Sequence, residues 1–402
     1  MVKSFIEARN IILNHASPLE SESVDLARLV RRVLGKAVCA PVDLPRWDNS
    51  EMDGFAVQAA DCQLLAQLKV TDYIPAGATA DGVKVEPGTA VRIMTGAPVP
   101  TGCDAIVPIE NTDGGRTTVT LHQAVQRGDF IRFRGSDIAK GEILLPAGKV
   151  LRPADINLLA AFSLTAAQVI RRPTVAILST GDELVAPGEP LGAGKIVDSN
   201  AYSLAAAVSE IGAIPQILGI AQDDRESLRK KISAGLKADL FITSAGVSAG
   251  DRDLVREILE QSGVHQLFWK VAIKPGGPTA FGLNGDKPVF SVPGNPVSSM
   301  IAFEELIRPA LLTMMGHKEV FRPQVTARVK GDLRNETNKT RFLRVKVKKT
   351  ADGLVAESAG DQNTGILSTM IRANGIAILP ADQTEIAAGE QVDIQLLNGV
   401  DQ

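Results

Sequence analysis

The chain has 402 residues, more than one hydrophobic core usually organises, so we expect two to four domains. Its residues are 45% hydrophobic and 22% charged with a formal net charge of -3, which gives no electrostatic footprint for nucleic acid or an anionic membrane. Three dispersed cysteines and four scattered histidines form neither a disulfide framework nor a zinc pattern, so we expect a cytoplasmic protein. We also expect no signal peptide and no transmembrane helix, because no run of 18 or more apolar residues occurs.

Residues 1–45 predict helices. Phe5, Ala8, Ile11 and Ile12 recur at helical spacing, and residues 24–34 carry a second apolar stripe of the same period. Another helix is expected from Pro153, with proline in its first turn. Because that helix has no obvious core of its own, we expect residues 140–173 to pack with residues 1–45 as one helical linker domain.

Residues 46–139 predict a β-rich domain. Short extended stretches separated by Pro and Gly turns are expected at residues 69–73, 90–94, 105–109 and 117–121. Two segments interrupt this pattern. Residues 46–55 are too polar for a strand and too apolar for a disordered linker, and residues 92–100 place Thr95 at a strand end.

Residues 174–321 alternate strands with helices. Strands are predicted at residues 174–178, 215–220, 240–244, 266–273 and 289–292. Helices are predicted at residues 201–211, 225–236, 254–261 and 297–315. This alternation predicts a three-layer α/β domain with a parallel-rich sheet covered on both faces. Residues 322–402 return to an all-β pattern without a helix signal, which predicts a small β-barrel.

Four strand signals of the α/β region run into Gly, Pro, Ser, Asp or Lys, at residues 180–183, 244–251, 270–278 and 293–299. In an open α/β sheet such breaks lie at the carboxyl edge, where ligands bind. Their spacing fits neither a dinucleotide fingerprint nor a P-loop. Donors suited to an anion are offered by Ser244, Gly246 and Ser248. Asp251 and Asp253 could hold Mg²⁺ or simply cap the next helix.

The other breaks also have two interpretations. Asp182 and Glu183 are typical of a metal or phosphate site and equally of a helix cap. Lys270 and Lys274 alternate within one apolar strand, which predicts an anionic partner or a solvated edge strand. A phosphate-binding helix N-terminus, or an ordinary helix start, is formed by Pro293, Gly294, Asn295 and Pro296. Together on one edge, these groups fit a nucleotide-like phosphoanhydride with Mg²⁺.

Six motifs carry a resemblance to a known family, at residues 48–55, 92–100, 179–184, 198–200, 268–276 and 293–298. With them the chain resembles the MoeA family of molybdopterin molybdenumtransferases, which are related to the C-terminal domain of gephyrin. The resemblance implies a homodimer of four-domain subunits with a MogA-like α/β domain. It also implies that molybdate enters the dithiolene of adenylylated molybdopterin, while Mg²⁺-assisted cleavage of the adenylate releases molybdenum cofactor and AMP. A MogA-like adenylyltransferase is an expected partner.

The resemblance assigns roles position by position. Active-site positions are matched by Asp53, Thr95 and Asp137 in the β-rich region and by Glu183, Asp223, Asp253, Lys270 and Lys274 in the α/β region. Pro293 and Pro296 would shape the helix-start loop, and Arg344 and Ser368 match barrel positions near the oxyanion pocket. Lysine and arginine would hold molybdate and phosphate, while acids would bind Mg²⁺ and orient water. The site would be shared between the α/β domain of one subunit and the β-rich domain of the other.

Two positions depart from the family pattern. Gly277 stands where the family usually has a second lysine, and Ala245 stands where it usually has a glycine. A methyl group at residue 245 is mild if φ is negative and disruptive if φ is positive.

Three hypotheses therefore stay open: the molybdenum-inserting enzyme, a paralogue using tungstate or another nucleotide-linked pterin, and a non-catalytic scaffold that binds cofactor intermediates or a partner protein. The scaffold hypothesis is disfavoured because such a protein would not need Lys270, Lys274, Asp53, Glu183 and Arg344 together.

Overall fold

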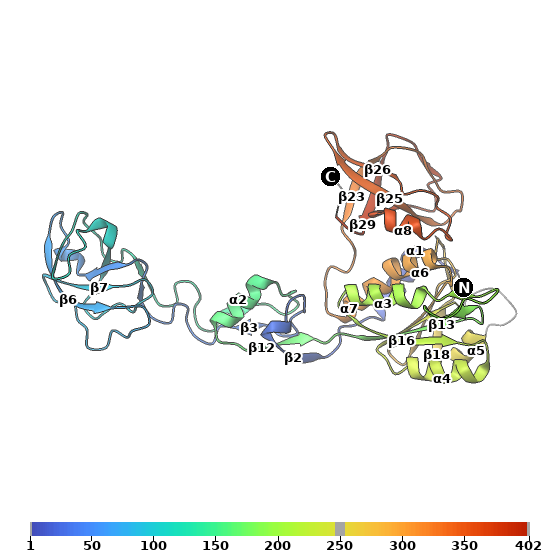
Figure 1. The fold of residues 1–402 in the computed structure, drawn as a ribbon, viewed down its shortest axis with the longest axis horizontal. Coiled ribbons are helices and arrows are strands. Elements are labelled where there is room, and N and C mark those ends of the chain that lie inside the picture. Colours follow the sequence, from blue (N-terminus) through green and yellow to red (C-terminus); the bar gives the residue numbers. More distant parts are fainter. Residues whose placement is uncertain (1, 246–253, 400–402) are drawn as a thin grey trace. The chain divides into compact units, whose positions relative to one another are not determined.

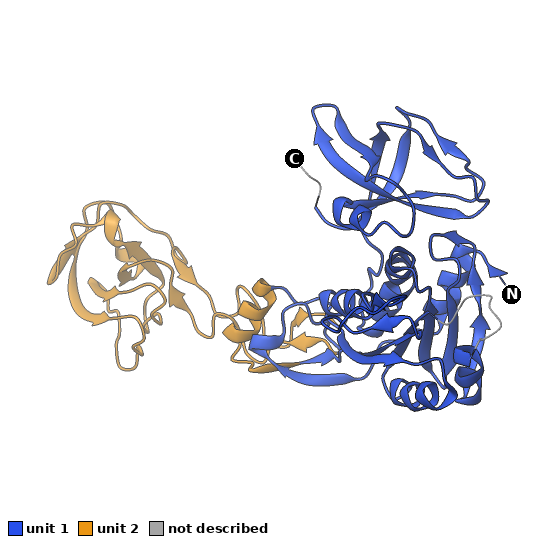
Figure 2. Ribbon diagram, turned by 45° about the vertical axis from the view of Figure 1, so that its right-hand side comes forward, with its two compact units in different colours: residues 1–35, 148–152, 168–402 blue, residues 36–147, 153–167 orange. Residues whose placement is uncertain are grey.

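The structure is a computed structural model that describes residues 2–245 and 254–399. The chain divides into two compact units (Figure 2). Unit 1 comprises residues 1–35, 148–152 and 168–402, and unit 2 comprises residues 36–147 and 153–167. Over the described ranges, the longest apolar helical stretches fall short of what a membrane crossing requires. The division into four domains stays a prediction.

The main sheet of unit 1 has six strands in the order β16–β13–β17–β22–β21–β18. Their bounds are β13 (Thr174–Thr180), β16 (Ile214–Ala221), β17 (Leu240–Ser244), β18 (Val264–Phe268), β21 (Ala280–Asn284) and β22 (Lys287–Val292). β13, β16, β17 and β22 are parallel, while β21 is antiparallel to both β18 and β22. The parallel-rich sheet is confirmed. β21 was not predicted, although the two residues between β21 and β22 are Gly285 and Asp286, a hairpin signal.

Helices cover both faces of this sheet, as predicted (Figure 1). One face packs α1 (Phe5–Asn14), α3 (Asn200–Glu210), α6 (Pro296–Ala302), a π-helical turn (Phe303–Ile307) and α7 (Arg308–Met314). The other face packs α4 (Arg225–Gly235) and α5 (Leu254–Gln261). Strand alternation explains the two cores, because Val175 and Ile177 of β13 face the first layer while Ala176 and Leu178 face the second.

The N-terminal region contains one of the two predicted helices. α1 begins after a capping box in which Ser4 and Glu7 satisfy each other's backbone N–H groups. The helix predicted at residues 24–34 is wrong: these described residues hold the end of β2 (Ser21–Asp25), a 3₁₀ turn (Leu26–Arg28) and irregular chain. Leu34 forms a β-bridge to Val169, and Val33 forms another to Val150. These long-range pairings override the local helical period.

Unit 2 contains a five-stranded sheet in the order β8–β5–β7–β6–β9. Its strands are β5 (Gly54–Val57), β6 (Gln67–Ile74), β7 (Thr89–Ile93), β8 (Ala105–Pro108) and β9 (Thr118–Thr120). The unit also holds the predicted helix α2 (Pro153–Ala161), the pair β3 (Val38–Cys39) and β11 (Ile143–Leu145), and the pair β4 (Asn49–Ser50) and β10 (Ile131–Arg132).

The prediction that residues 46–55 are too polar for a strand is wrong in two places, since β4 lies within this stretch and β5 begins at its end. β5 begins at Gly54 and lies fully buried between β8 and β7. Glycine is required there, because a Cβ atom on Gly54 would lie 2.0 Å from the Val107 carbonyl oxygen.

The C-terminal strands of unit 1 close a five-stranded barrel in the order β25–β26–β23–β29–β27, with β27 pairing back to β25. Their bounds are β23 (Gln324–Val329), β25 (Thr340–Thr350), β26 (Gly353–Ser358), β27 (Gly375–Leu379) and β29 (Gln391–Leu396). The barrel prediction is confirmed, but the expected lack of helix is wrong, since α8 (Ser368–Arg372) follows β26. The short strands β24 (Leu333–Arg334) and β28 (Glu385–Ile386) pair beside it.

The strand predicted at residues 266–273 is also wrong. The chain leaves the main sheet after Phe268 and forms β19 (Lys270–Val271) and β20 (Ile273–Lys274). β19 pairs with β1 (Val2–Lys3), whereas β20 pairs with β25 of the barrel. The apolar run is therefore divided among three partners, which its period alone does not reveal.

Candidate functional site

Three neighbouring strands of the main sheet, β13, β17 and β22, end side by side, as three of the four sequence breaks predicted. The fourth break, at residues 270–278, contains β20, which pairs with the barrel instead. The register places Ser179 beside Ser244 and Ser244 beside Val292. Asn200, the first residue of α3, connects two of these breaks. Its Nδ2 donates hydrogen bonds to Ser244 Oγ at 2.8 Å and to the Gly294 carbonyl at 2.8 Å. Asn200 thus fixes the two chain turns relative to each other.

Three polar atoms at this edge are buried without a hydrogen-bond partner in the described part of the chain. They are Ser179 Oγ, Asn200 Oδ1 and Asn295 Oδ1. A buried polar atom left unpaired costs about 1–3 kcal/mol, and native structures normally pair it with protein, water or ligand. The carboxyl edge is therefore chemically suited to a polar ligand.

Ala245, at the next position along the chain, has a left-handed backbone. Its φ is +75°, and its N–H donates to the Val292 carbonyl at 3.0 Å. A Cβ atom added to Gly294 would lie 3.3 Å from the Ala245 Cβ. The departure from glycine at residue 245 is thus of the disruptive kind. The remaining predicted residues of this break, Gly246, Ser248, Asp251 and Asp253, lie outside the described residues.

The acidic break after β13 is exposed. Asp182 Oδ1 accepts the N–H of Asp223 at 3.0 Å, which links the ends of β13 and β16. The carboxylate of Glu183 folds back over Gly181. Asp224 supplies the cap of α4 instead, by accepting the N–H groups of Glu226 and Ser227.

The described residues hold no cluster of three or more metal-binding side chains. Asp182 and Glu183 nevertheless fit Mg²⁺, which proteins commonly hold through one or two carboxylates together with substrate phosphates.

The two predicted lysines do not share a strand face. Lys270 pairs in register with Val2, and Lys274 pairs with Arg341 of the barrel. Both side chains are exposed, and neither ammonium has a partner among residues 2–245 and 254–399. Gly277 lies just beyond them. Its φ is not left-handed, and a Cβ atom there would lie 3.0 Å from the Ile273 carbonyl oxygen.

The helix-start loop is tied to the barrel. Asn295 Nδ2 donates to Thr364 Oγ1 at 3.0 Å, and Ser299 Oγ donates back to the Pro293 carbonyl. Pro296 begins α6. The Gly294 carbonyl accepts from Asn200, so the loop is held from both sides.

Arg344 is fully buried inside the barrel. Its guanidinium donates to Thr369 Oγ1 at 3.1 Å and to the carbonyls of Asp361 and Asn363 at 3.2 Å each. Burial, followed by the charge of Arg341, lowers its pKa. Arg344 thus anchors the segment that presents Thr364 to Asn295.

Ser368, the other predicted barrel residue, is exposed at the start of α8. Its Oγ accepts a hydrogen bond from Arg372 at 3.2 Å. The structure brings neither Ser368 nor Arg344 into contact with the residues of the carboxyl edge within the described ranges.

Unit 2 joins two of its predicted site residues directly. The N–H and the Oγ1 of Thr95 both donate to one carboxylate oxygen of Asp53, at 2.7 Å each. These two bonds, backbone first, hold the pKa of Asp53 below its ordinary value, and the charge of Arg92 adds to the effect. Asp137 is exposed on another segment, where its N–H donates to the Leu44 carbonyl at 3.2 Å.

Comparisons with known proteins agree with this architecture. Three family models match in series: the MoeA N-terminal region (domain I and II) at residues 3–163, the probable molybdopterin binding domain at residues 176–313, and the MoeA C-terminal region (domain IV) at residues 326–397. Molybdopterin molybdenumtransferase 2 of Mycobacterium tuberculosis (strain CDC 1551 / Oshkosh) is 38% identical over 98% of this chain and 99% of its own length. The chain belongs to the MoeA family.

Two further matches support this MoeA assignment. The molybdopterin molybdenumtransferase of Staphylococcus aureus (strain MRSA252) is 33% identical over 97% of this chain and 94% of its own. The crystal structure of the molybdopterin biosynthesis MoeA protein from Pyrococcus horikosii is 30% identical, with a TM-score of 0.87, over 99% of this chain and 100% of that one. MoeA membership makes the chain a transferase of molybdenum cofactor biosynthesis, as the sequence predicted.

Two residues of the candidate site received no role from the sequence. Asn200 connects Ser244 with Gly294, and Thr364 connects the barrel with Asn295. The motif at residues 198–200 was a signal for Asn200. Thr364 had none, because its importance depends on a contact between segments 69 residues apart.

Proposed function

We propose that this chain inserts molybdate into adenylylated molybdopterin and cleaves the adenylate with Mg²⁺, releasing molybdenum cofactor and AMP. Family membership supports the pathway. The observation that carries the chemistry is the pair of exposed ammonium groups of Lys270 and Lys274, which have no partner in the described ranges. Unpaired cations next to a carboxyl edge rich in polar groups suit a ligand that carries both an oxyanion and phosphates.

The chain's own groups divide the work. Lys270 and Lys274 neutralise the entering oxyanion and the phosphates. Asn200 holds Ser244 and the Gly294 turn in place, so their donors are already oriented when the ligand arrives. Asn295 and Thr364 fix the helix-start loop, and Arg344 acts through them as a positioning residue.

Asp182 and Glu183 would hold Mg²⁺ at the acidic break. There the ion would neutralise phosphate charge as the phosphoanhydride is cleaved. Asp53 stays ionised at neutral pH, because the hydrogen bonds from Thr95 lower its pKa. It is therefore available to accept a hydrogen bond or to orient water.

The proposed enzyme works in the cytoplasm as a homodimer. In this proposal, Asp53 and Thr95 of one subunit complete the carboxyl-edge site of the other. A MogA-like adenylyltransferase supplies the adenylylated substrate.

Release of AMP tests the proposal directly. The purified chain is mixed with adenylylated molybdopterin, Mg²⁺ and molybdate, and AMP is quantified by chromatography. We expect AMP release to depend on molybdate and to fall by about tenfold or more in Lys274→Gln, since a charge-assisted bond contributes about 1.5–3 kcal/mol. Lys69→Gln, at an exposed lysine of β6, is the matched control and should keep full activity.

The outcomes separate the hypotheses. Absence of AMP with either molybdate or tungstate, from folded protein, would refute an enzymatic role and favour the scaffold. AMP released with tungstate alone would select the tungstate paralogue, the second candidate, which the replacement of a usual lysine by Gly277 favours.

A further inference from the structure

A basic cavity of about 380 Å³ lies at the edge of the main sheet opposite the candidate site. Arg172 precedes β13, and Gly212 and Ala213 precede β16, so the cavity borders the amino ends of these strands. Residues 30–33, the end of α3 and residues 315–317 form its other walls. All of these residues belong to unit 1. The candidate site described above occupies the carboxyl ends, so the cavity is a separate feature.

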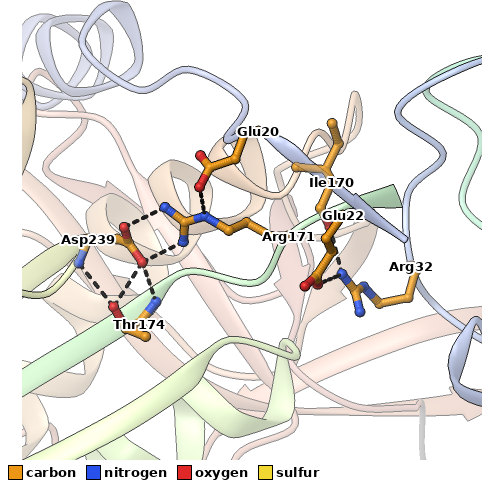
Figure 3. A network of polar contacts seen from close by, with 7 residues as sticks. All are labelled: Glu20, Glu22, Arg32, Ile170, Arg171, Thr174 and Asp239. Atoms are coloured by element: carbon orange, nitrogen blue, oxygen red, sulfur yellow. Dashed lines mark hydrogen bonds and ion pairs between the residues drawn. The ribbon is translucent and has the colours of Figure 1, made fainter. Parts of the chain in front are cut away.

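The charge of the lining is unbalanced. Arg31, Arg32 and Arg172 line the cavity, and Glu210 is its one lining carboxylate. Glu210 already lies 3.7 Å from Arg322, which is outside the cavity. Arg32 is likewise committed, because it donates to Glu22 at 2.5 Å and to the Ile170 carbonyl at 2.9 Å (Figure 3).

Two guanidinium groups of the lining form no hydrogen bond or ion pair with the described residues. The side chains of Arg31 and Arg172 have no hydrogen-bond or ion-pair partner in the part of the chain that the structure describes. Burial, followed by repulsion from Arg32 and Arg28, lowers the pKa of Arg172, and the nearby charge of Glu22 offsets only part of this effect. Arginines that outnumber the acids around a concave site focus a positive potential that attracts anions.

Arg31 also has a strained backbone. Its φ is +65°, a left-handed conformation that L-residues avoid. A neighbouring segment of the same chain maintains this conformation, since the Arg31 N–H donates to the Leu151 carbonyl at 2.8 Å. Strain of this kind persists where the surrounding structure enforces it and often marks a binding site. A glycine would be the ordinary residue here, so the side chain of Arg31 needs another reason.

Part of the lining is an apolar wall formed by Val30, Val33, Ile170, Ile211 and Met315. A cavity of this size, with an apolar wall facing a few convergent charges, has the dimensions of a small-molecule site. We propose that the cavity binds a small organic phosphate monoester, with its phosphate between Arg31 and Arg172 and its apolar body against the aliphatic wall. Arginine suits phosphate because its planar fork donates two parallel hydrogen bonds.

Calorimetric titration with phenyl phosphate and with inorganic phosphate tests this site. The titrations use the full chain carrying Lys270→Ala and Lys274→Ala, so that the proposed catalytic site contributes little phosphate binding. We expect one phenyl phosphate to bind per chain, more tightly than inorganic phosphate. Adding Arg172→Gln should weaken binding about tenfold, as loss of a charge-assisted bond implies.

Arg31→Gly is the second variant, since it removes the guanidinium while suiting the left-handed backbone. We expect it to weaken binding as Arg172→Gln does, while circular dichroism shows an unchanged fold. Arg127→Ala is the control, because this side chain is 87% exposed and lies in unit 2. The proposal is overturned if phenyl phosphate does not bind. It is equally overturned if both cavity variants bind as tightly as their parent, or if Arg127→Ala weakens binding to the same degree.

Discussion

The methyl group of Ala245 lies on a backbone conformation that favours glycine, at φ +75° beside the candidate site. An L-residue in this region costs about 1–2 kcal/mol, part of which glycine returns through its freer unfolded chain. We therefore predict that Ala245→Gly raises the free energy of unfolding by up to about 1 kcal/mol, measured by urea denaturation. Ala238→Gly, at another buried alanine of the same domain, should lower it instead. A loss of stability in Ala245→Gly would show that the positive φ is not strained.

Gly277 tests whether a single position sets the oxyanion preference. The backbone accepts a side chain there with a shift of a few tenths of an ångström, because a Cβ atom would lie 3.0 Å from the Ile273 carbonyl and φ is not left-handed. We predict that Gly277→Lys adds a third ammonium next to Lys270 and Lys274 and lowers the molybdate concentration needed for half-maximal AMP release. Gly277→Gln is the neutral control. An unchanged molybdate titration would show that residue 277 does not contact the oxyanion.

Glu305 is a buried acid whose pKa is raised. It lies in the π-helical turn, 3% exposed, and burial, followed by repulsion from Glu304, raises its pKa to about 8 from the ordinary 4.5. The folded state therefore keeps a proton that the unfolded state releases, so unfolding free energy should fall between pH 4.5 and pH 8. The slope is about 1.4 kcal/mol per pH unit at most.

Glu305→Gln should remove that slope while preserving the packing. We predict that the variant equals the wild type near pH 5 and exceeds it in stability near pH 8, measured by denaturation across this range. Parallel pH profiles for the two proteins would refute a proton on Glu305.

Polar contacts between elements hold the amino ends of β13 and β17 together (Figure 3). Arg171 donates to both carboxylate oxygens of Asp239 at 2.7 Å each, and it also contacts Glu20. Thr174 donates its N–H and its Oγ1 to Asp239 at 2.8 Å each. Burial alone would raise the pKa of Asp239, but these bonds outweigh it and lower the pKa to about 2.

Asp239 thus stabilises the fold at neutral pH. Its contribution is complete above pH 3.8 and is lost as the pH falls through about 2. We predict that Asp239→Asn lowers the free energy of unfolding by about 2–3 kcal/mol at pH 7 and reduces the loss of stability in acid. Asp382→Asn, at an exposed aspartate, should change neither quantity. A variant as stable as the wild type would show that the network contributes nothing.

Helices and strands whose apolar residues repeat at a regular spacing were predictable from the sequence. The amphipathic helices of the α/β domain and the strands of the barrel follow from spacing, and so does the meeting of strand ends at one edge. Elements defined by distant partners were not. The helix predicted at residues 24–34 does not form, because this segment makes β-bridges to Val150 and Val169. Residues 266–273 contribute to three different sheets. Sequence period records which face is buried but not which segment buries it.

The site shows the same limit. Asp53, Thr95 and the acidic residues after β13 were selected as candidates from residue type and resemblance, and their roles stay predictions. The sequence could not show that Asn200 holds Ser244 and Gly294. These residues lie 44 and 94 positions from Asn200, and hydrogen bonds over such separations leave no local pattern. Arg344 was assigned from the resemblance to the family, and the sequence could not show that its guanidinium donates to Thr369 and to two backbone carbonyls of the same domain.

At the scale of the whole molecule, the candidate residues belong to two compact units: Asp53 and Thr95 to unit 2, and the lysines to unit 1. Mixing two inactive variants tests whether these halves meet across a homodimer. In a dimer of Asp53→Asn with Lys274→Gln, a shared arrangement gives one site with both residues intact and one site with neither. Random exchange should therefore restore about a quarter of the wild-type sites.

The measurement is AMP release after the two variants are co-expressed, with dimers verified by light scattering. The control pairs Asp53→Asn with the double variant Asp53→Asn/Lys274→Gln, which cannot form an intact site in either arrangement and should stay inactive. If each subunit used its own Asp53 and Lys274, the mixed dimer would also stay inactive, because each chain carries one defect. Recovery in the first mixture and not in the control would therefore assign the two halves to different subunits.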